Sequence, residues 1–295
     1  MNQESDSPAA QTLTTIRRLL GDAGLSPRKR HGQHFLIDGN LMQKLLDAAE
    51  IGEADCILEV GVGTGSLTRL LAGCGRQVIG VEIDAEIIKV AETMLADAPN
   101  VTLIRADALQ TKSTLNPDVV NVLQQELARS RGMLKLVANL PYDIATSLVI
   151  NLLISDLPFS RLCFTVQKEV GDRFMAAPGT SDYGAVGIIT QSLARASRVA
   201  RVPPEAFWPR PKVESVMIRL DPHGPQGQPV SDPRRFSEFV RGFFLHRRKT
   251  MAHLIKGRER ESQLSKCLDQ LGIDPRARPE QIAVAQWQEL YNSGQ

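Results

Sequence analysis

Apolar and polar positions along the chain form a regular alternation of short strand-like and longer helix-like segments from about residue 51 onwards. Short apolar runs typical of buried strands cover residues 56–60, 78–82, 101–105, 134–138 and 162–166. Segments with apolar residues at helical spacing lie between them, at residues 67–72, 85–95 and 147–153. This alternation predicts an α/β fold, in which helices cover both faces of a mostly parallel sheet.

The segments on either side of this core differ from it in composition. Residues 1–25 read as an N-terminal extension, with a short amphipathic helix predicted at about residues 13–20. Residues 221–233 are rich in proline and glycine and are typical of a linker. Beyond them, residues 234–295 have the pattern of a small helical domain, which leaves residues 26–220 as one large domain.

Composition narrows the class of protein. Hydrophobic residues make up 42% and charged residues 23% of the 295 positions, as in an ordinary globular protein. No apolar run is long enough to cross a bilayer, and the N-terminus lacks a secretory signal, so we expect a cytoplasmic protein without membrane contact. The four cysteines form no C-x-x-C pair and no zinc-like spacing, so we expect reduced thiols and no metal. Because the net charge is only +2, affinity for nucleic acid has to come from local clusters.

The stretch EVGVGTG over residues 59–65 follows a predicted strand and opens a predicted helix. Open α/β sheets bind ligands at this position, and glycines allow the backbone to approach a ligand closely. A dinucleotide fingerprint would place Gly or Ala at position 66, where this chain has Ser66, which disfavours an NAD-dependent oxidoreductase. The pattern resembles the first motif of methyltransferases that use S-adenosyl-L-methionine, although a plain strand-to-helix connection is the alternative.

Acidic residues follow at the ends of the next two predicted strands. Glu82 can accept hydrogen bonds from both hydroxyls of a ribose, and Asp107 can accept one from the amino group of an adenine. Asp84 is the rival to Glu82, but its place beyond the strand end makes it second choice. Together with the glycines, these acids predict a nucleoside-containing cofactor.

The strand predicted at residues 134–138 runs into Asn139, Leu140, Pro141 and Tyr142. Pro141 cannot donate to a sheet, so the strand ends here, at the edge that holds the cofactor. An exocyclic adenine amine is a poor nucleophile, and the Asn139 amide oxygen and the Leu140 carbonyl can each accept one of its N–H groups. Tyr142 offers a face on which the base can stack. The alternative is a helix-capping Asn followed by a buried Tyr.

These motifs together resemble the 16S ribosomal RNA adenine N6-dimethyltransferase family. The matching stretches are GQHFL (32–36), EVGVGTG (59–65), NLPY (139–142), VQKEV (166–170), YG (183–184) and FWPRPKVES (207–215). The resemblance implies a Rossmann-like class I methyltransferase domain at residues 26–220 and a small all-α domain at its C-terminal side. It also implies a cofactor pocket for S-adenosyl-L-methionine, formed by His34, Leu36, Gly61, Glu82, Asp107 and Asn139.

The resemblance further implies a target-adenine site made of Asn139, Leu140, Pro141 and Tyr142, with Phe207 as a second stacking wall. The implied reaction is dimethylation of two adjacent adenines near the 3' end of 16S rRNA in the immature small ribosomal subunit, by a monomeric enzyme. One rival is a resistance methyltransferase that acts on large-subunit RNA. Another is an assembly factor that binds the subunit without chemistry.

Two basic clusters are candidates for RNA contacts. Arg28, Lys29 and Arg30 directly precede the GQHFL stretch. Residues 241–260 hold seven Lys or Arg against the single acidic Glu259. Within that segment we predict a helical apolar stripe, which would leave three basic side chains towards solvent, although a solvated helix face is the alternative. The stripe consists of Phe244, Met251, Leu254 and Ile255, and the basic residues are Arg247, Arg248 and Lys249.

Overall fold

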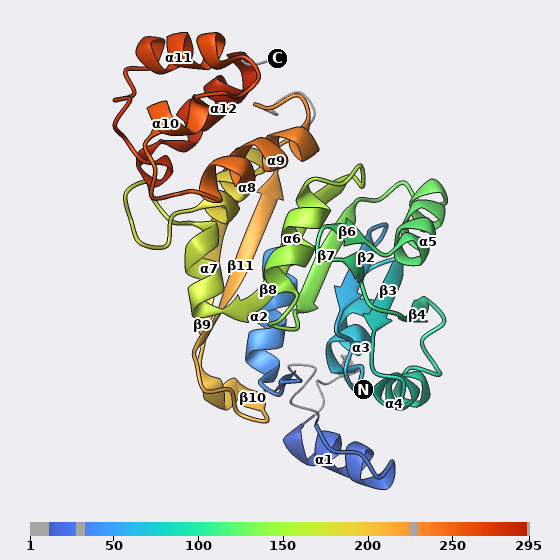
Figure 1. Cartoon of the computed structure of the whole chain (residues 1–295). Helices are drawn as coiled ribbons and strands as arrows, with labels where there is room; N and C mark the ends of the chain where they lie inside the picture. Colours follow the sequence, from blue (N-terminus) through green and yellow to red (C-terminus); the bar gives the residue numbers. More distant parts are fainter. Residues whose placement is uncertain (1–11, 28–32, 225–228, 294–295) are drawn as a thin grey trace. The chain divides into compact units, whose positions relative to one another are not determined.

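The computed structural model describes residues 12–27, 33–224 and 229–293 of the chain. Its central sheet has seven strands in the order β4-β3-β2-β7-β8-β11-β9 (Figure 1). Neighbours from β4 to β8 pair in parallel, and β11 pairs antiparallel with β8. The α/β fold predicted from the alternating pattern is thus confirmed. The strands are β2 (Cys56–Val60), β3 (Gln77–Glu82), β4 (Val101–Arg105), β7 (Leu134–Asn139), β8 (Phe159–Gln167), β9 (Ala194–Val202) and β11 (Ser215–Pro222).

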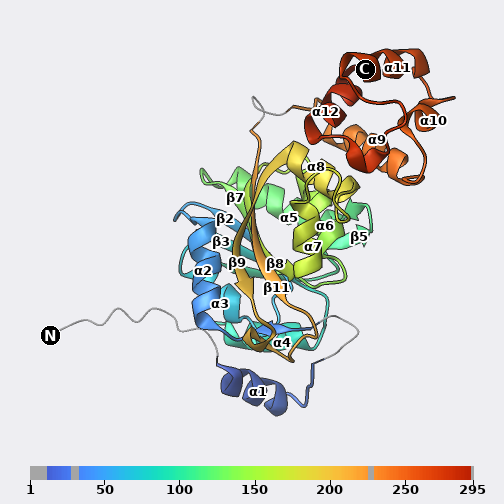
Figure 2. The same cartoon turned by 90° about the vertical axis from the view of Figure 1, so that its left-hand side faces the viewer.

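Helices cover both faces of this sheet. Figure 2 shows α2 (Gly39–Ala49) and α3 (Ser66–Ala72) on one face, with α5 (Pro117–Ala128) and α6 (Ala145–Leu153) on the other. The apolar residues of α2 recur at helical spacing and pack, together with those of α3, against the buried side chains of the strands. A further helix, α4 (Ile87–Met94), packs Ala91 with Val62.

Two short ribbons join segments that are distant in sequence. β1 (Phe35–Leu36) pairs antiparallel with β10 (Phe207–Trp208), and β5 (Leu109–Thr111) pairs antiparallel with β6 (Thr114–Leu115). The first ribbon brings the GQHFL and FWPRPKVES stretches together, next to the short 3₁₀ turn η2 (Pro204–Ala206).

An N-terminal helix, α1 (Leu13–Asp22), packs onto this region. The Thr12 hydroxyl caps it by accepting from the Thr15 amide. Its apolar face buries Ile16 and Leu20 against Phe35 and Ile87. Part of the predicted N-terminal extension is therefore a packed element of the fold, while residues 1–11 lie outside the described residues.

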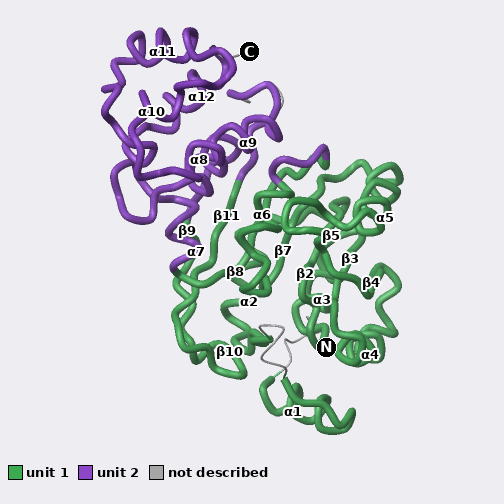
Figure 3. Tube along the Cα trace, viewed as in Figure 1, with its two compact units in different colours: residues 1–152, 157–168, 198–220 green, residues 153–156, 169–197, 221–295 purple. Residues whose placement is uncertain are grey.

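The chain divides into two compact units, coloured separately in Figure 3. The first comprises residues 1–152, 157–168 and 198–220, and the second comprises residues 153–156, 169–197 and 221–295. Residues 169–197 thus group with the C-terminal helices, whereas the sequence placed them in the large domain. The second unit includes α7 (Lys168–Phe174, from Glu169 on), α8 (Ala185–Leu193), α9 (Pro233–Phe244), α10 (Met251–Ile255), α11 (Glu261–Gln270), η3 (Pro279–Gln281) and α12 (Val284–Ser293).

Contacts within the second unit explain this grouping. α8 packs against α9 and α12, and the buried Tyr183 hydroxyl donates to the Ile282 carbonyl over 2.7 Å. The predicted linker is also shorter than residues 221–233, because β11 continues to Pro222 and α9 begins at Pro233. Residues 225–228 of that linker lie outside the described residues.

The prediction of one helical apolar stripe across residues 241–260 is wrong in one respect. The segment does not form a single continuous helix. α9 ends at Phe244, and α10 begins only at Met251. The Met251 and Ala252 amides donate to the carbonyls of Ala277 and Pro275, over 2.8 and 2.9 Å, rather than to a preceding turn. Carbonyl groups distant in sequence therefore accept from the two amides that, in a continuous helix, would donate to the preceding turn.

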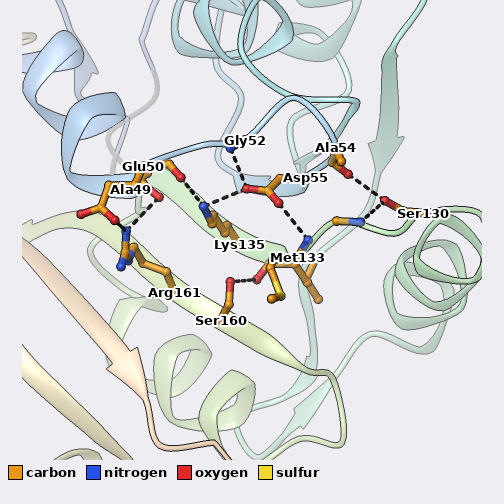
Figure 4. A network of polar contacts seen from close by, with 12 residues as sticks. Ala49, Glu50, Gly52, Ala54, Asp55, Ser130, Met133, Lys135, Ser160 and Arg161 are labelled. Atoms are coloured by element: carbon orange, nitrogen blue, oxygen red, sulfur yellow. Dashed lines mark hydrogen bonds and ion pairs between the residues drawn. The ribbon is translucent and has the colours of Figure 1, made fainter.

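A buried polar network holds the amino-terminal ends of β2 and β7 (Figure 4). Lys135 Nζ lies 2.8 Å from Asp55 Oδ2, with both side chains less than a tenth exposed, and also donates to the Glu50 carbonyl. The carboxylate of Asp55 accepts in addition from the amides of Gly52 and Met133, each over 2.8 Å. This end of the sheet lies opposite the carboxyl ends of the parallel strands.

Candidate active site

A cavity lies at the carboxyl ends of the parallel strands, where the strand order reverses between β2 and β7. Ligands bind at such a reversal because the loops that leave neighbouring strands in opposite directions open a crevice. The structure brings nine of the residues predicted from sequence into its lining: His34, Leu36, Gly61, Glu82, Asp107, Asn139, Leu140, Pro141 and Tyr142.

The glycine-rich turn between β2 and α3 forms one wall of the cavity. Gly61, Gly63 and Gly65 have φ angles of 84°, 57° and 82°, in the left-handed region that favours glycine. A Cβ atom on Gly63 would lie 2.9 Å from Cε1 of Phe35, and one on Gly61 would lie 3.1 Å from Cδ and Cγ of Pro141. The turn is therefore packed against two other cavity-lining segments, and side chains there would force them apart.

Glu82 lies at the end of β3 with its side chain pointing at the glycine turn. Its Oε2 accepts from the Gly63 amide and its Oε1 from the Asp84 amide, both over 3.0 Å. Burial raises the pKa of Glu82, and these amide hydrogen bonds oppose the rise. The carboxylate can still accept a hydrogen bond from a ligand.

Asp84, the rival to Glu82, has a different environment. It is buried and does not line the cavity. Its Oδ1 accepts from the Glu86 amide over 3.0 Å at the start of α4, and its Oδ2 accepts from Gln33 over 3.2 Å. Its surroundings thus favour a capping role, and the geometry supports Glu82 as the ligand-binding acid.

Asn139 ends β7 with its carboxamide held at both ends. Its Nδ2 donates to the His34 carbonyl over 2.8 Å, and its Oδ1 accepts from the Thr165 hydroxyl. The amide is thus fixed before any ligand arrives.

Tyr142, three residues further on, is fixed at its hydroxyl and at its ring. The hydroxyl shares a 2.7 Å hydrogen bond with Ser215 Oγ, and the ring stacks on His34 at 5.4 Å between centroids. His34 Nδ1 in turn lies 2.6 Å from the Pro209 carbonyl oxygen. Tyr142 of the NLPY loop therefore contacts His34, which precedes β1, and Ser215, which follows β10.

A comparison with known proteins identifies the family of this chain. The family model described as ribosomal RNA adenine dimethylase matches residues 24–295. The chain belongs to the ribosomal RNA adenine dimethylase family. The resemblance indicated by the sequence motifs is confirmed.

Two relatives show how far this dimethylase-family similarity extends. The chain is 36% identical over 284 residues to ribosomal RNA small subunit methyltransferase A of Pediococcus pentosaceus, covering 95% of this chain and 93% of the relative. It is 38% identical over 276 residues to the protein of the same name from a Synechococcus species, covering 90% and 94%.

Solved structures of similar proteins share the dimethylase fold. A dimethyladenosine transferase from Plasmodium falciparum gives a TM-score of 0.71 at 22% identity, covering 87% of this chain and 96% of that one. The 23S rRNA methyltransferase ErmE gives a TM-score of 0.62 at 23% identity, covering 88% and 99%. At this level of identity the likeness concerns the fold.

A dimethylase needs a methyl donor, and the cavity residues fit S-adenosyl-L-methionine. Glu59, the acid of the EVGVGTG stretch, lines the cavity and is 1% exposed, and its Oε2 has no hydrogen-bond partner among the described residues. Burial raises the pKa of Glu59 to about 8. An orphaned buried carboxyl oxygen beside a glycine cradle suits a ligand that carries an amino group. The motif pointed to Glu59, but sequence reasoning gave it no role of its own.

Phe207 is the predicted site residue that the structure does not bring to the cavity. It is 2% exposed, packs in the core cluster with α2 and α3, and is absent from the cavity lining. The register of the β1–β10 ribbon pairs Phe207 with Leu36. The expectation of a second stacking wall at Phe207 is therefore wrong. Ile16 of α1, for which sequence reasoning gave no signal, does line the cavity.

The predicted RNA-binding residues fall into two groups. Arg28, Lys29 and Arg30 lie outside the described residues. Arg247, Arg248 and Lys249 are exposed in the segment between α9 and α10 of the second unit, close in sequence to Leu245, which is 78% exposed.

Two observations on the described residues concern the expectations that the protein binds no metal and contacts no membrane. Residues 12–27, 33–224 and 229–293 contain no cluster of three or more His, Cys, Asp or Glu side chains that could hold a metal ion. Among these same residues, none of the helices has the length and apolar content needed to span a membrane.

Proposed function

We propose that this dimethylase transfers methyl groups from S-adenosyl-L-methionine to the N6 amines of two adjacent adenines near the 3' end of small-subunit rRNA. The observation that carries the proposal is the Asn139 carboxamide, held at both ends in the same cavity as the glycine turn. The relatives named ribosomal RNA small subunit methyltransferase A favour the small subunit over the large one.

The chemistry follows from the acceptors in the NLPY loop. An adenine amine is a weak nucleophile because its lone pair is delocalised into the ring. Asn139 Oδ1 keeps one lone pair after accepting from Thr165, and it would accept one N–H of the amine. The Leu140 carbonyl would accept the other, which favours a pyramidal nitrogen with its lone pair directed at the methyl group. Positioning and preorganised electrostatics therefore supply the rate enhancement.

Tyr142 would hold the base that leaves its RNA stack. His34 lies on one face of the Tyr142 ring, so the adenine would stack on the other face. The Ser215 hydrogen bond and the His34 contact keep the ring in place before the base arrives.

The cofactor would occupy the part of the cavity between the glycine turn and the strand ends. S-adenosyl-L-methionine supplies an electrophilic methyl group when bound. Glu82 would accept from the ribose hydroxyls and Asp107 from the adenine amino group, while Glu59 would face the amino group of the methionine portion. His34, Leu36, Gly61 and Asn139 would complete the pocket.

The second unit would bind RNA. Arg247, Arg248 and Lys249 are exposed and adjacent, in a chain with a net charge of only +2. Arg28, Lys29 and Arg30 stay candidates for phosphate contacts on the strength of their place beside the GQHFL stretch.

The experiment is transfer of tritiated methyl groups to immature small subunits and, separately, to large subunits, followed by mapping of the modified bases. We expect label on two adjacent adenines of the small-subunit RNA. Asn139→Ala should lower turnover by about a hundredfold or more while cofactor binding changes little. Label confined to large subunits would instead support the resistance class, and binding without label would support an assembly factor.

A further inference from the structure

Thr165 lies beside Asn139 across the β7–β8 pair. The two residues are direct partners in the parallel register, and the Thr165 hydroxyl donates to Asn139 Oδ1. Thr165 is fully buried in the middle of the sheet, and it pairs with Met217 on its other side. None of the sequence motifs assigned it a role.

The two ends of the Asn139 amide have different partners, and these partners determine its orientation. The His34 carbonyl can only accept, so the Nδ2 end of the amide has to face it. The Oδ1 end then faces Thr165, whose hydroxyl can donate. Thr165 is branched at Cβ and enclosed by strands on both sides, so its side chain has little rotational freedom.

We propose that Thr165 is a positioning residue for methyl transfer, because its hydroxyl keeps Asn139 Oδ1 turned so that the remaining lone pair meets the target amine. This inference rests on the proposed function. With the amide turned over, its NH₂ group would face the amine, and two donors would oppose each other where an acceptor is needed. The His34 carbonyl opposes this rotation, and the Thr165 hydroxyl adds the second contact that holds the amide in its native orientation. Loss of the Thr165 hydroxyl removes that second contact.

Three variants test this role. Thr165→Val replaces the hydroxyl with a methyl group of similar size, and Thr165→Ser keeps the hydroxyl. The matched control is Thr190→Val, since Thr190 is equally buried but does not line the cavity, and its hydroxyl has no hydrogen-bond partner in the part of the chain that the structure describes. Thermal unfolding of each variant shows whether it is folded.

The expected result is a change in kcat without a change in binding. Thr165→Val should lower kcat by about tenfold or more, with KM for RNA and the Kd for S-adenosyl-L-methionine within about twofold of the wild type. Thr165→Ser should recover most of the loss, and Thr190→Val should keep the wild-type kcat. An unchanged kcat in folded Thr165→Val, or an equal loss in Thr190→Val, would overturn the proposal.

A second readout needs no RNA and separates this inference from the proposed function. The side-chain amide protons of Asn139, assigned by their disappearance in Asn139→Ala, should exchange slowly with solvent in the wild type. In Thr165→Val they should exchange at least about tenfold faster, while in Thr190→Val they should exchange at the wild-type rate. If the wild type transfers no methyl groups but this difference is present, the proposed function fails and the positioning contact stands. Equal exchange in all three proteins would rule out the positioning role.

Discussion

Gly61 lies directly against the ring of Pro141. A Cβ atom at position 61 would be 3.1 Å from both Cδ and Cγ of that ring and 3.5 Å from the Asn139 carbonyl oxygen. The glycine turn after β2 and the NLPY loop after β7 are thus in contact at the reversal of strand order. Because of this contact, the proposed cofactor and adenine sites form one continuous surface.

Substitution of Gly61 by alanine should affect both stability and function. The left-handed φ of 84° should cost about 1–2 kcal/mol of folding free energy, and the new Cβ would displace Pro141. Gly179→Ala is the control, since Gly179 has a φ of 82° and an alanine Cβ there would meet no atom of the described residues within 4 Å. Denaturant unfolding should show the cost of the left-handed φ in both variants and a larger loss of stability in Gly61→Ala, where Pro141 has to shift. Calorimetry and turnover should show weaker cofactor binding and slower methylation in Gly61→Ala alone; equal behaviour would mean that the contact with Pro141 does not matter.

The affinity for S-adenosyl-L-methionine should depend on pH through Glu59. Burial raises the pKa of Glu59 to about 8, so its carboxyl is neutral below that pH and charged above it. Since a charged carboxylate binds an ammonium group better, affinity should rise as the pH increases towards 8, with release of a proton on binding. Titrations in buffers of different ionisation heat measure both effects. Glu59→Gln should remove the proton release, and proton release that persists in this variant would point to another group.

The raised pKa of Glu59 has the opposite effect on the ligand-free protein, whose stability should fall as the pH rises. A carboxyl whose folded pKa is about 8, against an ordinary value of 4.5, favours the folded state most below pH 4.5. That contribution is lost as the pH rises towards 8. Stability curves of the wild type and Glu59→Gln should therefore diverge across this range, with the variant losing less.

The buried pair of Asp55 and Lys135 should be important for stability (Figure 4). Asp55→Asn leaves the Lys135 ammonium without its counter-charge and should cost about 3–5 kcal/mol of folding free energy. As a control, Asp22→Asn breaks an ion pair with Arg18 whose side chains are 68% and 66% exposed, and it should have no measurable effect. Chemical denaturation measures both variants. A loss no larger than that of the control would mean that Lys135 finds other partners.

The pair of Asp55 and Lys135 also predicts that the protein becomes less stable in acid. Burial opposes the ionisation of Asp55, but the hydrogen bonds from Lys135, Gly52 and Met133 outweigh it and lower its pKa. A lowered carboxyl pKa contributes stability above the ordinary value of 3.8, and that contribution is lost as the pH falls through the folded value.

RNA binding should depend on salt through the exposed basic segment between α9 and α10. If Arg247, Arg248 and Lys249 each neutralise a phosphate, replacing all three with alanine should flatten the salt slope by roughly two to three units. The control is alanine at Lys266, Arg276 and Arg278, which removes the same charge from other positions of the second unit. Cofactor affinity should be unchanged in both variants. Equal salt slopes in the two triple variants would place the docking surface elsewhere.

The sequence by itself determined the features that depend on local patterns. Apolar runs predicted the parallel strands β2, β3, β4, β7 and β8, and helical spacing predicted α3, α4 and α6, because the burial of a strand or of one helix face is encoded within a few residues. The strands β9 and β11 were not predicted. Gly61 and Asn139 could likewise be placed in one site, because the carboxyl ends of parallel strands meet at the same edge.

Tertiary structure decided the features that depend on partners distant in the chain. The register of the β1–β10 ribbon buried Phe207, and the carbonyls of Ala277 and Pro275 accept the Met251 and Ala252 amides that one helix across residues 241–260 would have used. The pairing of β7 with β8 placed Thr165 against Asn139. A hydrogen bond or a packing contact between distant residues exists only once the chain has brought them together, so no local pattern specifies it.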